Sequence, residues 1–97
     1  MAARGFSTTV SKGLRELRVH MSQGSVSSKG LRDFIGQAYP GLKQAHPGLP
    51  ILIREASGVD AQIIARFERG RERKIVVDDM TAGDVEQRFR ALVAGDK

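Results

Sequence analysis

Side chains that commonly do chemistry are scarce in this sequence. Cysteine is absent, which excludes disulfides, thiol redox chemistry, iron–sulfur ligation and cysteine zinc sites. The two histidines, His20 and His46, stand alone and lack the spacing of a zinc site. Asp78 and Asp79 are adjacent and suit a turn better than an acid–base pair. Neither glycine-rich phosphate-binding motif occurs. We therefore expect no catalytic residue, no cofactor and no metal in this chain.

The densest basic cluster lies in one short segment of the second half. Five Lys and Arg side chains gather there: Arg66, Arg69, Arg71, Arg73 and Lys74. Such a cluster can bind phosphates by releasing counterions, as ribosomal proteins do. Only Phe67 is nearby for base stacking, and Glu68 and Glu72 weaken the positive field. The pattern favours a solvated rim or a protein contact over RNA.

Excess positive charge lies in the first half of the chain. Residues 1–50 hold seven Lys and Arg against two Asp and Glu, whereas residues 51–97 hold nine against nine. A basic half suits an acidic protein surface, nucleic acid or a mitochondrial address. The first fifteen residues contain no acid, as in transit peptides. We predict that residues 1–13 form a tail, which is either an uncleaved address or a solvated segment.

The length limits the chain to one domain. With 97 residues, 40% of them hydrophobic, it can form a single small domain, which we place at residues 14–95. Such a domain buries only about 65% of its unfolded surface, so support from a partner is expected. No apolar run approaches the roughly 18 residues of a membrane-spanning helix.

Residues 14–21 alternate between apolar and polar side chains. The alternation gives an apolar set and a polar set: Leu17, Val19 and Met21, and Glu16, Arg18 and His20. This period of two is typical of a strand with one covered face.

A helix is predicted after the serine-rich loop at residues 22–28, with Ser27 or Ser28 as its N-cap. The apolar stripe of this helix consists of Leu31, Phe34, Ile35, Ala38 and Leu42. Pro40 has no N–H and its ring crowds the preceding turn, so we expect the helix to stop or kink near Tyr39.

The segment PGLPILIREA, Pro47 to Ala56, predicts a second strand. Pro50 suits the first residue of a strand because its missing N–H is not needed there. The apolar run 51–53 is too short for a helix and suits a sheet covered by a helix. We expect a buried strand with charge only at its tip, at Arg54 and Glu55.

The rest of the chain predicts a hairpin and a final helix. Residues 62–68 alternate, a turn surrounds Gly70, and residues 74–77 return as a strand. Thr81 and Asp84 resemble a helix-capping box, and Gly95 suits the helix end. The apolar face of this helix consists of Val85, Phe89, Leu92 and Val93.

The order β-α-β-β-β-α predicts an α/β fold with a four-stranded mixed sheet and two main helices. The first two strands are expected to be parallel and the last two antiparallel. The segment between the second and third strands leaves little room for a helix, so one sheet face should lack cover. That face is the expected docking site, through charged side chains that are otherwise solvated or paired among themselves. The candidates are Glu16, Arg18, His20, Arg54 and Glu55.

Four segments stand in a recognisable order: LRELRVHMSQ, SKGLRDFI, HPGLPILIREASGV and ARFERG. With the final helix they resemble the small thioredoxin-like accessory subunits of mitochondrial respiratory complex I. That family also includes proteins of the large subunit of the mitochondrial ribosome. The resemblance implies a thioredoxin-like domain in the matrix-facing peripheral arm at the inner membrane, docked on the large iron–sulfur subunit. It also implies that the chain has no cofactor and no catalysis of its own.

The sequence departs from that family at its possible redox positions. Many members have one cysteine after the first strand and another after LPILIRE, and these positions match Ser22 and Ala56. The proposed redox switch of the family is therefore lost here. The position of the cis-proline of thioredoxin-like enzymes matches Ala61, and only proline adopts the cis form at low cost.

Three classes of protein remain: a structural subunit of complex I, a mitochondrial ribosomal protein that binds ribosomal RNA, and a thioredoxin-like oxidoreductase. The absence of cysteine opposes the oxidoreductase. Ribosomal proteins usually carry longer basic tails, whereas this chain ends in AGDK after a half with no net charge. We therefore predict a non-catalytic accessory subunit of complex I, with RNA binding as the alternative.

Overall fold

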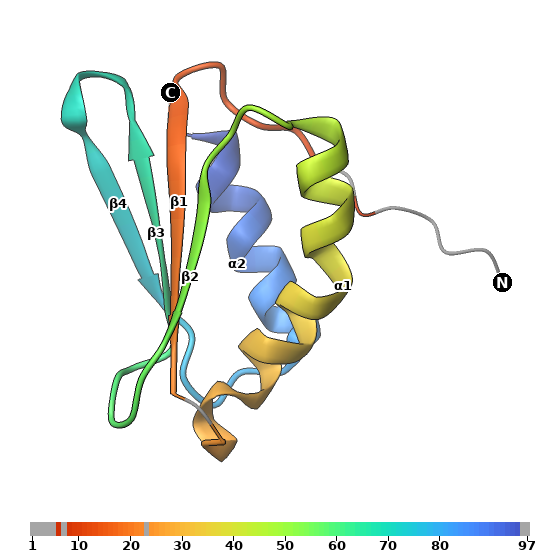
Figure 1. The fold of residues 1–97 in the computed structure, drawn as a ribbon, viewed down its shortest axis with the longest axis vertical. Helices are drawn as coiled ribbons and strands as arrows, with labels where there is room; N and C mark the ends of the chain where they lie inside the picture. Colours follow the sequence, from red (N-terminus) through yellow and green to blue (C-terminus); the bar gives the residue numbers. More distant parts are fainter. Residues whose placement is uncertain (1–5, 7, 23, 96–97) are drawn as a thin grey trace, which may run out of the picture.

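The computed structural model describes residue 6 and residues 8–22 and 24–95 of the chain. Six main elements follow one another in the predicted order β-α-β-β-β-α (Figure 1). Their bounds are Leu14–Met21 for β1, Lys29–Ala45 for α1, Ile51–Glu55 for β2, Gln62–Phe67 for β3, Glu72–Val76 for β4 and Ala82–Ala94 for α2. Two one-turn 3-10 helices are η1, Val26–Ser28, and η2, Glu68–Gly70.

The strands form one mixed sheet in the order β2-β1-β3-β4. β1 pairs in parallel with β2 and antiparallel with β3, and β3 and β4 form an antiparallel hairpin. Val19 in β1 lies opposite both Ile53 of β2 and Ile63 of β3. The parallel first pair and the final hairpin are confirmed, with α1 as the crossover that a parallel pair requires.

Both helices lie on one face of the sheet (Figure 1). The apolar set of β1 is buried there as predicted, together with Ile63, Ala65 and Phe67 of β3. The predicted stripes of both helices are buried against them: Leu31, Phe34, Ile35, Ala38 and Leu42 in α1, and Val85, Phe89, Leu92 and Val93 in α2. Each fully buried large apolar side chain stabilises the fold by roughly 1.5–3 kcal/mol, so the core between the two helices and the central strands β1 and β3 is the main source of stability.

The predicted end of the first helix near Tyr39 is wrong, because α1 continues through Pro40 to Ala45. Pro40 is exposed, and so is Gly36, whose carbonyl loses its helical partner. That carbonyl can bond to water, whereas Ala38 and Leu42 stay buried on the inner side. Burial of the stripe offsets the roughly 3 kcal/mol that a proline costs inside a helix.

Ser28 occupies the N-cap position of α1, as predicted, but its side chain makes no capping hydrogen bond to the helix. Ser25, rather than Ser27 or Ser28, accepts a hydrogen bond as an N-cap, from the backbone N–H of Ser27, and it begins η1. Ser28 is fully buried, and its hydroxyl accepts from the backbone N–H of Ser22 at 2.9 Å. Because η1 leads directly into α1, the side-chain capping bond lies at Ser25, three residues before Ser28.

The final helix follows its sequence signals. The hydroxyl of Thr81 accepts from the backbone N–H of Asp84 at 3.2 Å, and Gly95 ends α2 with a φ of 80°. Asp79, in the turn before α2, has a φ of 62°, and a short aspartate tolerates this left-handed conformation. The predicted helix start, helix end and turn are confirmed.

The prediction that the second strand is buried is wrong. β2 is an edge strand, and its side chains Leu52 and Ile53 are 44% and 40% exposed. Only its beginning is covered, since Leu49 is buried and Ile51 is half-buried. The helices cover β1 and β3 in the middle of the sheet, which leaves this apolar strand largely at the surface.

The segment before β1 lies against the helices. The ring of Phe6 lies 5.5 Å from that of Phe34 and 6.0 Å from that of Phe89, between centroids. The guanidinium carbon of Arg90 lies 4.6 Å from the centre of the Phe6 ring, a cation–π arrangement. Phe6 therefore closes one end of the aromatic core.

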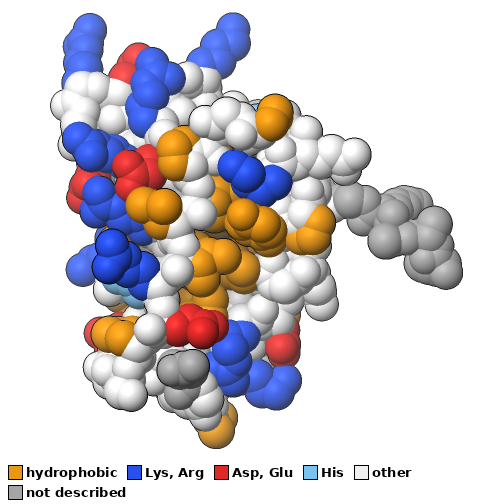
Figure 2. Space-filling view, viewed as in Figure 1, with side chains coloured by type: hydrophobic (Ala, Val, Ile, Leu, Met, Phe, Trp, Pro, Cys, Tyr) orange, Lys and Arg blue, Asp and Glu red, His pale blue; other side chains and the backbone are white. Residues whose placement is uncertain are grey.

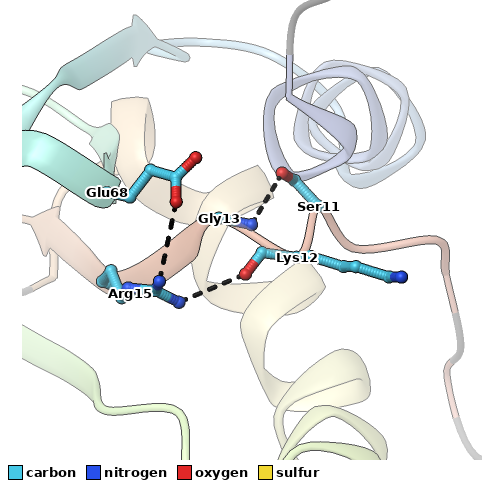
Figure 3. A network of polar contacts seen from close by, with 5 residues as sticks. All are labelled: Ser11, Lys12, Gly13, Arg15 and Glu68. Atoms are coloured by element: carbon cyan, nitrogen blue, oxygen red, sulfur yellow. Dashed lines mark hydrogen bonds and ion pairs between the residues drawn. The ribbon is translucent and has the colours of Figure 1, made fainter.

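Residues 11–15 are tied to two later elements, and Figure 3 shows the contacts around Arg15 and Glu68. The backbone N–H of Ser11 donates to the carbonyl of Val93 at 2.7 Å, at the end of α2. The Arg15 guanidinium donates to the Lys12 carbonyl at 3.2 Å and lies 3.7 Å from the Glu68 carboxylate (Figure 3). These contacts fix the entry into β1 beside the hairpin.

Candidate docking surface

The face of the sheet opposite the helices has no helical cover in the described part of the chain (Figure 1). Alternate residues of every strand point to this face, because side chains alternate along a strand. We call this surface the open face: Glu16, Arg18, His20, Leu52, Arg54, Gln62, Ile64, Arg66, Glu72, Lys74 and Val76. Residues 56–61 join β2 to β3 without a helix. The predicted loss of cover is confirmed.

Four of the five predicted docking residues lie on the open face, and Glu55 does not. The register pairs Arg54 with His20, and it pairs Glu55 with the buried residue Met21. Glu55 therefore lies on the helix side of β2, which corrects its place in the candidate set. Adjacent residues of one strand always point to opposite faces, so Arg54 and Glu55 cannot share a surface.

Glu16 and Arg18 form an ion pair on the open face. The Nε–H of Arg18 donates to Oε2 of Glu16 across 2.6 Å. This hydrogen bond, followed by the charge of Glu16, raises the pKa of Arg18. Both charges are thus partly satisfied within the domain, and Arg54 is the more available cation for a partner.

Two shallow hollows adjoin each other beside β2. One of about 330 Å³ is lined by Arg18, His20, Leu52 and Arg54. The other, of about 140 Å³, is lined by His20, Arg54, Ala56 and Val59, and its exposed surface is almost entirely apolar. Together they can accept a carboxylate next to an apolar side chain. Leu52 and Val59 could not be predicted as lining residues, because their place beside Arg54 depends on the strand register and on the path of the loop after β2.

His20 is held from the neighbouring strand. The amide nitrogen of Gln62 in β3 lies 3.3 Å from Nδ1 of His20. This contact orients the imidazole on the open face. His46 lies at the far end of α1 as its C-cap, so the two histidines do not come together.

The two positions that match family cysteines lie side by side. The backbone N–H of Ala56 donates to the carbonyl of Met21 at 3.2 Å, directly before Ser22. Ser22 is buried, and its carbonyl accepts from the Arg32 guanidinium at 3.1 Å. The fold therefore brings together the ends of β1 and β2, where this chain has a serine and an alanine and no thiol.

Ala61, which matches the family's cis-proline position, is held by a turn residue. Its backbone N–H donates to Oδ1 of Asp78 at 2.8 Å, and its carbonyl accepts from the N–H of Val77. A proline would have no N–H to give to Asp78. Asp78 thus serves the turn after β4, as predicted.

The basic hairpin lacks an aromatic surface for bases. Phe67 is 3% exposed and belongs to the core. Its ring lies 5.9 Å from the guanidinium carbon of Arg71. Base stacking requires an accessible ring face, so the hairpin offers charge without a stacking platform.

The residues that the structure describes contain neither a candidate metal site nor a candidate membrane span. Among them, no three His, Cys, Asp or Glu side chains gather in a group that could hold a metal ion. Within the same residues, no helix has the length and apolarity needed to cross a membrane.

Comparison with known proteins identifies the family. Residues 31–82 match the family described as "Mitochondrial ribosomal protein L51 / S25 / CI-B8 domain". The chain belongs to this family. It is 44% identical over 97 residues to NADH dehydrogenase (ubiquinone) 1 alpha subcomplex subunit 2 of Mus musculus, covering 98% of each chain.

Plant and fungal relatives carry related names. The Arabidopsis thaliana protein of the same name is 41% identical over 93 residues, which cover 96% of this chain and 93% of the relative. The NADH-ubiquinone oxidoreductase 10.5 kDa subunit of Neurospora crassa is 37% identical over 82 residues, which cover 84% of this chain and 87% of the relative.

Proposed function

We propose that this chain is an accessory subunit of mitochondrial respiratory complex I, the NADH dehydrogenase (ubiquinone) of the respiratory chain. The observation that carries the proposal is near full-length similarity to subunits of this enzyme from an animal, a plant and a fungus. All three relatives are named for the enzyme and none of them for the ribosome. The ribosomal alternative is therefore set aside.

The proposed role is structural rather than catalytic. The fold that we propose is thioredoxin-like, with the helix between β2 and β3 missing and the open face exposed in its place. Ser22 and Ala56 cannot carry out thiol chemistry. A domain that buries this face on a neighbour binds the folded state of that neighbour and so stabilises it by mass action.

The proposed neighbour is the large iron–sulfur subunit of the peripheral arm, on the matrix side of the inner membrane. Docking would use Glu16, Arg18, His20 and Arg54 on the open face, with Glu55 contributing only from the other side of β2. The domain would include Phe6 and residues 8–13 besides residues 14–95, because Phe6 packs on the aromatic core and Ser11 bonds to Val93. A mitochondrial address within residues 1–13 would then be an uncleaved one. The charge excess of +5 supports an acidic docking surface.

Native electrophoresis of gently solubilised mitochondrial membranes tests the function. We expect the polypeptide, identified by mass spectrometry, to comigrate with NADH dehydrogenase activity. We also expect a deletion strain to contain less intact complex, and restoring the chain to recover it. Comigration with ribosomal RNA that is lost on raising the salt would contradict the proposal, and so would an unchanged amount of complex in the deletion strain.

A further inference from the structure

The outer edge of β2 has an unused row of backbone hydrogen-bonding groups. The N–H of Leu17 donates to the carbonyl of Pro50, and the N–H of Ala56 donates to that of Met21. In a parallel ladder the groups of alternate residues point the same way. Positions 50, 52, 54 and 56 therefore face β1, and positions 51, 53 and 55 point outward. No strand lies beyond β2 in the described chain.

This edge is apolar on both sides of the strand. Leu52, on the open face, is 44% exposed, and Ile53, on the helix side, is 40% exposed. Figure 2 shows hydrophobic side chains gathered in the middle of the view, where Figure 1 draws β2 and α1. Edges that must stay unpaired usually carry charged side chains, above all lysine, or a proline or a bulge. β2 has charges only at its last two residues, Arg54 and Glu55, and has no lysine, proline or bulge.

The surroundings of the edge define the chemistry of its partner. Arg54 is exposed and lines both hollows beside β2, with Arg18 and His20 next to it. A carboxylate in the larger hollow would meet these cationic and polar groups, and apolar side chains would cover Leu52 and Ile53. A second copy of the chain would instead bring another Arg18 and Arg54 to the same face, in a protein that already carries a charge of +5.

We propose that β2 accepts an extended, acidic and apolar segment of another subunit as a fifth strand of the sheet. This inference rests on the proposed function and adds the mode of contact. Main-chain hydrogen bonds to positions 51, 53 and 55 supply the pairing, as in other cases of strand addition. Arg54 and the two apolar side chains select the segment.

Proline substitutions at the two edges test the pairing. Ile53→Pro removes an outward N–H without touching the ladder to β1, and Val76→Pro is the matched control. Val76 is 45% exposed. Arg71 bonds to Phe67 and Val77 bonds to Ala61, so the alternate positions 72, 74 and 76 point outward from the hairpin. In cells that lack the native chain, we expect about tenfold weaker retention of Ile53→Pro in complex I. We expect Val76→Pro to be retained like the native chain.

Single cysteines give a second measurement that leaves the backbone unchanged. The native chain has no cysteine, so Ile53→Cys and Val76→Cys each create one labelling site. With a benzophenone maleimide attached at position 53, we expect cross-links in complex I to an acidic, apolar segment of another subunit. Position 76 should give none to that segment. This measurement remains decisive if Ile53→Pro does not fold.

The outcomes separate the two proposals. If the native chain does not migrate with complex I, the proposed function fails. If it does, but position 53 forms no cross-link or Ile53→Pro is fully retained, strand addition fails and the function stands. Cross-links from position 53 to a second copy of this chain would show self-pairing and would also overturn the inference.

Discussion

The two edges of the sheet differ in a way that their position alone does not explain. β2 and β4 are both five residues long, and each pairs on one side only. β4 begins with three consecutive charged residues, Glu72, Arg73 and Lys74, whereas β2 begins with three apolar ones. Charge along an edge strand disfavours pairing with a further strand, and β2 is charged only at its end, at Arg54 and Glu55. The difference indicates that β4 is protected against pairing with a further strand and that β2 is not.

Both edge strands nevertheless depend on the same hydrophobic core. A substitution that destabilises this core should therefore affect the two edges alike. Phe34 is almost fully buried, with its ring centroid 5.1 Å from that of Phe89. We expect Phe34→Ala to lower the free energy of unfolding by about 3–5 kcal/mol, because it leaves a cavity between the helices. Urea unfolding of the purified chain measures this loss. A change below 1 kcal/mol would mean that the helices are not packed as described.

Placing lysines in the apolar part of β2 should strongly weaken docking and leave the fold intact. We expect Leu52→Lys combined with Ile53→Lys to reduce retention in complex I by at least about tenfold, because lysine blocks edge pairing and cannot be buried unpaired. The free energy of unfolding of the isolated chain should change by only about 0.5 kcal/mol per site, since neither side chain belongs to the buried core. The control is Val76→Lys, which should be retained. Equal losses from both edges would remove the distinction between them.

A smaller effect is expected from replacing Arg54 alone, the cation of β2 that lines both hollows. Arg54→Gln should weaken retention about threefold, a typical value for an exposed ion pair, and the loss should shrink as salt is raised. Ser22→Ala is the matched control within the same part of the fold, because its carbonyl and N–H contacts belong to the backbone. Co-purification at two salt concentrations provides the measurement. If both variants are retained equally, Arg54 does not contact the partner.

The helices and strands could be predicted from the sequence because their signals are local. Period-two alternation placed β1 at Leu14–Met21, and Thr81 and Gly95 marked the ends of α2. Pro40 predicts a helix end that the structure does not have. The hydrogen bond that proline cannot make lies on the exposed side of α1, and the buried inner side keeps the helix in place. The final strand was displaced by one or two residues, Glu72–Val76 instead of 74–77, since charged residues can extend an edge strand without breaking its pattern.

The candidate docking residues were predictable only in part. Glu16, Arg18 and His20 share a face by alternation alone, and Arg54 joins them through the parallel register. Grouping Arg54 with Glu55 was wrong for the same physical reason, since neighbours in a strand point apart. The sequence pattern predicts Leu52 and Ile53 as core residues, because three consecutive apolar residues are common in buried strands.

By itself, the sequence determined the order of the elements, the absence of thiol chemistry and the presence of a face without a helix. These follow from composition and from spacings of a few residues. Tertiary structure decided that β2 is an edge, that its apolar side chains remain exposed, and that Phe6 packs on the aromatic core. Those outcomes depend on strand order and on contacts between residues far apart in the chain, which no short window of sequence contains.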